Sequence, residues 1–181
     1  MSETKETFLP FFKGVFSQWH ICSFSDPALS DYEFGSAGQY MMYKKAILFN
    51  DKDIAQKILI SKSQSTIKAL GRKVSGFNQE TWDNHKMEIV LHANILKFSN
   101  PVLKKKLIDT YPKILVEASP YDHIWGVGLS ITDTRVCIKA SWRGQNLLGQ
   151  CLVNARYVLM GRYSEDFINR MNSPLKEFYL Q

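Results

Sequence analysis

The stretch EFGSAGQYMMYKKAILF, Glu33–Phe49, predicts the first long helix of this chain. Most of its residues favour a helix, and we expect the helix to span about 36–49. Gly38 lies within its first turns, although glycine costs a helix about 1 kcal/mol relative to alanine. The position therefore raises the question of what a larger residue would have done there.

One face of this helix combines a lysine with apolar residues. Gly38, Met42, Lys45 and Phe49 are spaced so that they share that face at 3.6 residues per turn. A lysine on such a stripe either extends its ammonium to solvent or serves a site, where burial lowers the pKa and frees a nucleophilic amine. The spacing alone leaves both interpretations open.

The rest of the chain predicts a mainly helical domain with a few short strands. We expect a flexible segment over 1–10 and one domain over 11–181. Short strands or loops are expected over 11–34. Asp51, Ser63 and Asn100 are expected to cap helices. The predicted helices span about 52–60, 63–71, 80–98, 100–111, 147–160 and 165–171, and the predicted strands span 114–118 and 135–140. Strands and helices do not alternate as in a Rossmann sheet.

Composition narrows the class of protein. The chain has 181 residues, 45% of them hydrophobic, without an apolar run of about 20 residues or a signal-peptide pattern, so we expect no membrane association. Cys22, Cys137 and Cys151 are widely spaced, which favours free thiols in the cytoplasm, or in the nucleus of a eukaryote. We predict neither a metal nor a cofactor. A net charge of +6 fits either a polyanionic partner or a mildly basic enzyme.

The segment LVEASPYDHIWGVGL, 115–129, gathers residues that can carry chemistry. Trp125 followed by Gly126 combines a flat aromatic face with close backbone approach, which suits stacking on a base or a sugar. Asp122 beside aromatic residues can act as an acid or a base. The same pattern also fits a structural loop with a core tryptophan and a solvated aspartate, and the residue types leave both open.

Two further segments are candidate phosphate sites. Gly144 and Asn146 precede the helix predicted at 147, and free N–H groups at a helix start bind anions; Arg143 can add a contact. The alternative is an asparagine cap without a ligand. Arg72 and Lys73 follow the end of another helix, where they either complement its dipole or reach a phosphate.

In chain order, the motifs FSQW, SAGQYMMYKKA, ALGRKV, KF, LVEASPYDHIWGVGL and GQNLLG resemble those of the NADAR (YbiA-like) family over about 11–160. The resemblance implies a single, mainly helical domain with N-glycosidase activity. It implies one of two substrates, namely ADP-ribose on the guanine amino group in nucleic acid, or phosphoribosyl-amino-pyrimidine intermediates of riboflavin synthesis. The motifs look more like those of stand-alone and toxin-linked members that reverse guanine ADP-ribosylation.

The resemblance also points to individual residues. Lys45 and Asp122 match catalytic positions of the family, whereas Gly38 stands where the family motif S-A-E-Q-Y-M-M has a glutamate. Residues expected to contact the ligand through stacking, charge or close backbone approach are Trp19, Ser36, Lys68, Arg72, Trp82, Trp125, Gly126, Gly144 and Asn146. The pyrophosphate is expected at the N–H groups of 144–146, with Arg72 or Lys68.

A glycine at position 38 is expected to affect turnover. A glutamate at position 38 could form a carboxylate pair with Asp122, as in many glycosidases. Without it we expect weak or absent turnover with retained binding of ADP-ribose, either in a disabled enzyme or in a non-catalytic binding module. The positive charge leaves a third possibility, a nucleic-acid-binding protein without chemistry.

Overall fold

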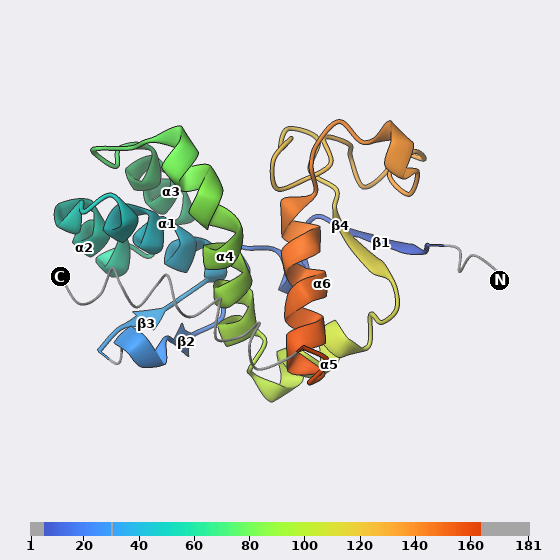
Figure 1. Ribbon diagram of the computed structural model, residues 1–181, viewed down its shortest axis with the longest axis horizontal. Helices are drawn as coiled ribbons and strands as arrows, with labels where there is room; N and C mark the ends of the chain where they lie inside the picture. The colour runs from blue at the N-terminus through green and yellow to red at the C-terminus, as the bar shows by residue number, and fades with distance from the viewer. Residues whose placement is uncertain (1–5, 30, 164–181) are drawn as a thin grey trace.

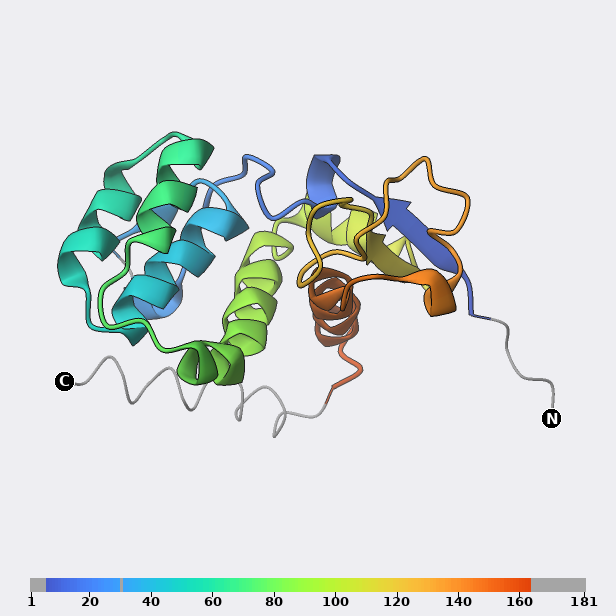
Figure 2. The same cartoon turned by 90° about the horizontal axis from the view of Figure 1, so that it is seen from above.

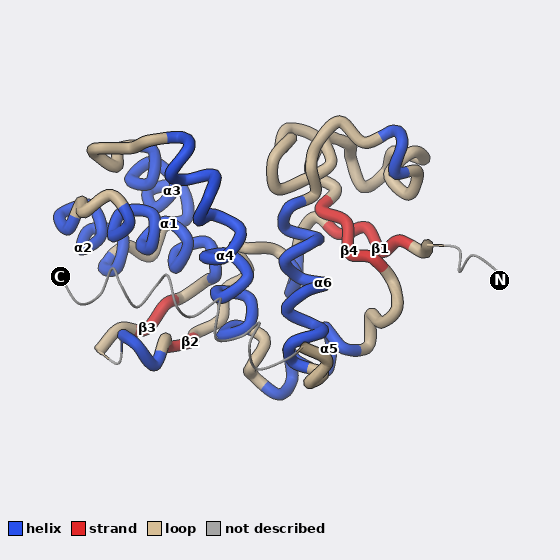
Figure 3. The backbone as a smooth tube through the Cα atoms, viewed as in Figure 1, coloured by secondary structure: helices blue, strands red, loops and turns tan. Residues whose placement is uncertain are grey.

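A computed structural model describes residues 6–29 and 31–163, and it is mainly helical with a few short strands, as predicted (Figures 1 and 3). The described elements are β1 (Phe8–Phe11), β2 (Phe24–Ser25), β3 (Glu33–Phe34), α1 (Ala37–Leu48), α2 (Lys52–Ile60), α3 (Gln64–Arg72), α4 (Gln79–Lys97), α5 (Pro101–Ile108), β4 (Ile114–Glu117) and α6 (Leu147–Leu159), with short 3-10 turns at Gly14–Phe16, Pro27–Leu29 and Lys139–Ser141.

Side-chain caps set the starts of the first five helices. The caps each accept a backbone N–H from the first turn, and they are Ser36, Asp51, Ser63, Asn78 and Asn100. These capped starts lie within a residue or so of the predicted ones. Helix α5 ends at Ile108 rather than near 111, because the next N–H groups bond back in tight turns. The helix predicted at 165–171 lies outside the described residues.

The prediction of a flexible segment over 1–10 is wrong for its last residues. Phe8–Phe11 forms β1, which pairs in parallel with β4, so that Phe8 lies opposite Ile114 and Phe11 opposite Glu117. The partner strand lies about a hundred residues further along the chain. The shared carboxyl end of this pair is where the candidate site is found.

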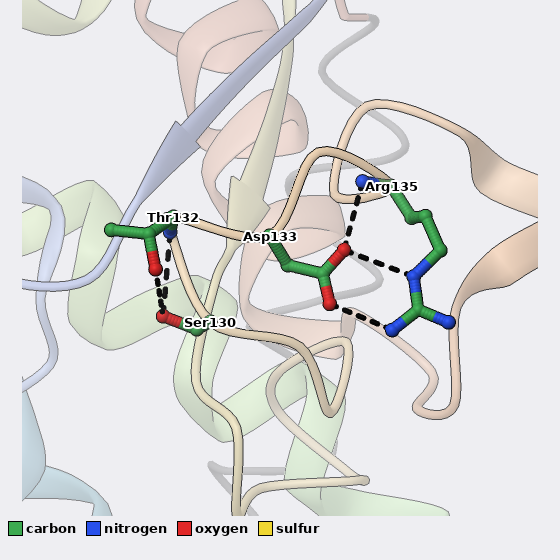
Figure 4. Close-up of polar contacts among 4 residues, drawn as sticks. All are labelled: Ser130, Thr132, Asp133 and Arg135. Atoms are coloured by element: carbon green, nitrogen blue, oxygen red, sulfur yellow. Dashed lines mark hydrogen bonds and ion pairs between the residues drawn. The ribbon is translucent and has the colours of Figure 1, made fainter.

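The strand predicted at 135–140 is also wrong, because this segment forms successive turns. The N–H groups of Val136 and Ile138 bond to the carbonyls of Asp133 and Arg135, three residues back, rather than to a partner strand. Asp133 also accepts hydrogen bonds from the backbone N–H and the guanidinium of Arg135 (Figure 4), and these contacts lower the pKa of Asp133 to about 2. The long connection from β4 to α6 is therefore ordered by local contacts.

Helices α4 and α6 pack against each other at the centre of the molecule. Helices α1, α2 and α3 lie on one side of α4, and β1, β4 and the long connection lie beside α6 (Figures 1 and 2). The main core is formed by buried apolar residues of α1, α4 and α6, and a smaller cluster around Val116 lies beneath the long connection. Within the described ranges, no helix is long and apolar enough to cross a membrane.

A buried polar cluster joins α1 to α4. The Tyr40 hydroxyl donates to Asp26 Oδ2 at 2.6 Å and lies 2.9 Å from His92 Nδ1. The Lys44 ammonium lies 3.8 Å from the Asp26 carboxylate. Burial lowers the pKa of Lys44 to about 8, with Asp26 acting in the opposite direction. These contacts fix the orientation of α1, whose other side faces the candidate site.

Candidate active site

A cavity of about 400 Å³ lies at the carboxyl end of the β1–β4 pair. Just beyond the strands, the Ala118 N–H donates to the Phe11 carbonyl, so the loops that follow β1 and β4 leave the sheet side by side. Helices α1, α3 and α6 complete the walls with Met41, Lys68 and Leu148. Crevices at the carboxyl ends of parallel strands are frequent ligand sites in α/β proteins.

Glu117, the last residue of β4, is a carboxyl group that sequence reasoning did not assign to the site. It lines the cavity, it is 9% exposed, and its Oε2 has no hydrogen-bond partner among the described residues. Burial, followed by the negative charge of Asp122, raises its pKa to about 8. Glu117 therefore holds a proton at neutral pH. The signal in the sequence was a single acidic residue at the end of an otherwise apolar strand.

Asp122 and Trp125 line the same cavity from the loop after β4. Asp122 Oδ1 accepts the N–H groups of Ile124 and Trp125 at 2.9 and 2.7 Å, which fixes both the carboxylate and the tryptophan. A Cβ at Gly126 would lie 2.9 Å from the Asp122 carbonyl and 3.0 Å from that of Glu117. Gly126 therefore allows close approach of backbone carbonyls from its own loop and from the end of β4.

Two of the three N–H groups expected to hold the pyrophosphate, those of Gln145 and Asn146, are bonded within the protein. The N–H groups of 145–148 all donate to carbonyls of the loop 123–126. Gly144 is packed against this loop, where a Cβ would overlap the Gly126 carbonyl. This segment forms a structural junction between the loop and the helix, and an anion site here stays a prediction. Gly144 and Asn146 border a separate cavity of about 520 Å³ beside Phe8 and Trp142.

Asn146 is a brace between β4 and α6 rather than a side-chain cap. Its Oδ1 accepts the Glu117 N–H, and its Nδ2 donates to the Leu115 carbonyl, both at 3.0 Å. Its backbone is left-handed, with φ of 54°, and its side chain is buried. Asn146 therefore holds the strand segment that carries the Glu117 side chain.

Trp19 fills the space in front of Gly38. A Cβ at Gly38 would lie 2.7 Å from two ring carbons of Trp19, and the Gly38 N–H donates to the Gln18 carbonyl at 2.7 Å. The Lys68 ammonium lies 4.7 Å from the centre of the Trp19 ring. Trp19 and Lys68 both line the cavity. The vacancy that the sequence suggested at Gly38 is thus occupied by an indole.

Lys45 lies apart from this cavity. Its ammonium donates to the Gly71 carbonyl at 2.9 Å and lies 4.4 and 5.5 Å from the ring centres of Phe77 and Trp82. Burial lowers its pKa. Arg72 is exposed at the end of α3, and Ser36 caps α1. The structure therefore brings together Trp19, Lys68, Asp122 and Trp125, but neither Lys45 nor Trp82 lines their cavity.

The loop that carries Trp19 is anchored from α4. Asn94 Nδ2 donates to Gln18 Oε1, and the Lys97 ammonium donates to the Ser17 carbonyl, both at 2.8 Å. Lys97 is 1% exposed, and burial lowers its pKa to about 8. Burial of a lysine costs free energy unless its ammonium group is compensated by polar partners. We therefore interpret the hydrogen bond from Lys97 to the Ser17 carbonyl as an anchor of the loop.

Replacing Lys97 is expected to loosen this loop. In Lys97→Met the Ser17 carbonyl loses its ammonium donor, a hydrogen bond to a charged group that contributes about 1.5–3 kcal/mol. Amide hydrogen exchange at 17–20 should then accelerate about tenfold or more, even if removal of a buried charge leaves global stability unchanged. Lys105→Met, at a lysine whose side chain is 77% exposed, is the matched control. Unchanged exchange at 17–20 in Lys97→Met would contradict the anchoring role.

Comparison with known proteins identifies the family. The model of the NADAR domain matches residues 9–160. The chain belongs to the NADAR family. The N-glycosidase R617 of Acanthamoeba polyphaga mimivirus is 46% identical to this NADAR domain over 146 residues, which are 78% of this chain and 85% of that protein. Such a relative supports a glycosylase class of enzyme.

Two other known proteins are similar to this chain. The Escherichia coli protein YbiA has the same fold, with a TM-score of 0.68 at 22% identity over 87% of this chain and 88% of that one. The chloroplastic riboflavin biosynthesis protein PYRR of Zea mays is 32% identical over 115 residues, which are 61% of this chain and 17% of that protein. Among the residues that the structure describes, no cluster of three or more histidine, cysteine or acidic residues could hold a metal.

Proposed function

We propose that this NADAR domain is an N-glycosidase that hydrolyses the bond between ADP-ribose and the guanine amino group of modified nucleic acid. The observation that carries the proposal is the pair of carboxyl groups, Glu117 and Asp122, in a cavity bordered by Trp19 and Trp125. The name of the viral relative supports the reaction class, and the net charge of +6 fits a polyanionic substrate.

The two carboxyl groups suit the two needs of the reaction. Cleavage of an N-glycosidic bond requires a proton for the departing nitrogen and stabilisation of the positive charge that develops on the sugar. Glu117, with a pKa raised to about 8, supplies the proton. The Asp122 carboxylate, held by two backbone N–H groups, stabilises the sugar cation or activates the water that adds to it. Trp19 or Trp125 stacks on the base or the sugar.

The same pair bears on the expected effect of Gly38. Because Glu117 and Asp122 supply carboxyl groups whatever residue stands at position 38, we propose weak but measurable turnover rather than none. Lys45 enters this scheme only if a ligand extends outside the cavity, since its ammonium donates to the Gly71 carbonyl. An electrostatic role and a covalent role for Lys45 are then both open to test by Lys45→Met.

A second candidate substrate is a phosphoribosyl-amino-pyrimidine intermediate of riboflavin synthesis, which the maize relative's name favours. It shares the N-glycosidic bond and a phosphate with the first. The third candidate is a non-catalytic domain that binds ADP-ribose. The three share the cavity and differ in which bond, if any, is broken.

The test offers the native chain an ADP-ribosylated guanosine oligonucleotide and the aminopyrimidine substrate in parallel, with Glu117→Gln as the control. Release of ADP-ribose from the oligonucleotide by the native chain, lost in Glu117→Gln, supports the proposal. Release of ribose 5-phosphate alone supports the second candidate. No release with either substrate, together with ADP-ribose binding by calorimetry, supports the binding module.

A further inference from the structure

The Trp19 ring contacts both a glycine and a lysine. It lies against α1, at a distance that leaves no room for a Cβ at Gly38. The Lys68 ammonium lies 4.7 Å from the ring centre. Trp19 and Lys68 both line the cavity that contains the two carboxyl groups. The three residues come from the loop after β1, from α1 and from α3.

The position of this ring is fixed by its neighbours. The Gly38 N–H holds the Gln18 carbonyl, Asn94 holds the Gln18 side chain, and Lys97 holds the Ser17 carbonyl. The loop therefore reaches α1 at a set distance. A side chain at position 38 would push the indole outward into the cavity, because the backbone on its N-terminal side is tethered.

The ring in turn places a charge. An ammonium over an indole face is attracted to the ring's electron density, which orders a side chain that otherwise has many rotamers. Lys68 thereby presents a fixed cation at the cavity wall. A compact ammonium of this kind binds phosphate oxygens as a point charge.

We propose that Gly38, Trp19 and Lys68 form one specificity-determining unit. The glycine seats the indole, the indole positions the ammonium, and the ammonium binds a phosphate group of the ligand. This inference rests on the proposed function, and it adds that the unit selects phosphate-bearing sugars for the same cavity. It assigns Gly38 a role in shape, in which alanine and glutamate are equally unsuitable, rather than in proton transfer.

The test uses the full chain and inorganic pyrophosphate as the probe, so it does not depend on turnover. Gly38→Ala adds one methyl group without a carboxylate, and Lys68→Met removes the cation. Each is expected to weaken pyrophosphate binding about tenfold in calorimetry, as the loss of a single charged contact does. The double variant is expected to lose little more than either single one, because the two act through the same contact. Lys105→Met is the control for net charge.

Three results would overturn the unit. They are native-like pyrophosphate binding by Gly38→Ala, an additive loss in the double variant, and absence of pyrophosphate binding by the native chain. If Gly38→Ala does not fold, Trp19→Leu tests the same link with α1 unchanged, and it should weaken binding as Lys68→Met does. A native chain that binds pyrophosphate through this unit but releases no ADP-ribose would refute the proposed function alone.

Discussion

Glu117→Gln is expected to lower kcat by about 10²–10⁴-fold at pH 7, the usual contribution of a general acid. Glutamine keeps the size of the side chain and its place at the end of β4, but it has no proton to give to the departing nitrogen. Ligand affinity should change much less, because Glu117 Oε2 has no hydrogen-bond partner among the described residues that the substitution would disturb. Steady-state kinetics with the preferred substrate separate the two effects.

The pH dependence provides a second readout of the same group. The pKa of Glu117 is raised from 4.5 to about 8, so the protonated acid predominates below pH 8. Above pH 8 the native rate should fall about tenfold per pH unit as the acid ionises, and Glu117→Gln should lack this fall. An identical alkaline limb in both proteins would show that another group is responsible.

Stability should follow the same titration. A carboxyl group with a raised pKa in the folded state binds protons more tightly there than in the unfolded chain, so native stability falls as pH rises from about 4.5 to about 8. Glu117→Gln removes this loss. The free energy of unfolding of Glu117→Gln, relative to that of the native protein, should therefore be higher at pH 9 than at pH 4. Urea unfolding of both proteins at the two pH values measures this difference.

Asn146→Ala is expected to destabilise the fold by about 3 kcal/mol. It removes two buried hydrogen bonds, each contributing about 0.5–1.5 kcal/mol, and leaves the Glu117 N–H and the Leu115 carbonyl without their partners. It also places alanine at a φ of 54°, a left-handed conformation that costs about 1 kcal/mol or more. Turnover should fall as well, because the brace positions the strand residue that carries the acid.

Asn146→Gly separates these two contributions. Glycine adopts the left-handed conformation freely, so this variant loses the hydrogen bonds without the backbone strain. It should therefore be more stable than Asn146→Ala and less stable than the native chain, in urea unfolding at one pH. A change below about 0.5 kcal/mol in Asn146→Ala, which is usual for surface positions, would contradict the bracing role.

The helices could be predicted because their signals are local. Asp51, Ser63 and Asn100 were expected to cap helices, and each does so at the expected start. The strand Phe8–Phe11 was missed because its partner is distant in the sequence. The segment 135–140 has the alternation of a strand, but it has no partner strand among the described residues, and hydrogen bonds to Asp133 form a local turn instead.

The candidate site could be predicted partly in its residue types and less in its packing. Asp122, Trp125, Trp19 and Lys68 were named from the sequence and line one cavity, while their roles in chemistry stay predictions. Asn146 was recognisable as a helix-start residue, but its left-handed backbone and its bonds to β4 depend on tertiary contacts. The contact of Trp19 with Gly38 likewise depends on how the loop after β1 packs against α1. Helical periodicity in the sequence cannot predict such a tertiary contact.

The most direct test of the account is a single-turnover measurement of ADP-ribose release from an ADP-ribosylated guanosine oligonucleotide, with the native chain in excess. We expect slow but complete release at pH 7, which declines above pH 8 and is lost in Glu117→Gln. A native chain that binds the oligonucleotide and releases no ADP-ribose, or a Glu117→Gln variant that releases it at the native rate, would contradict the account.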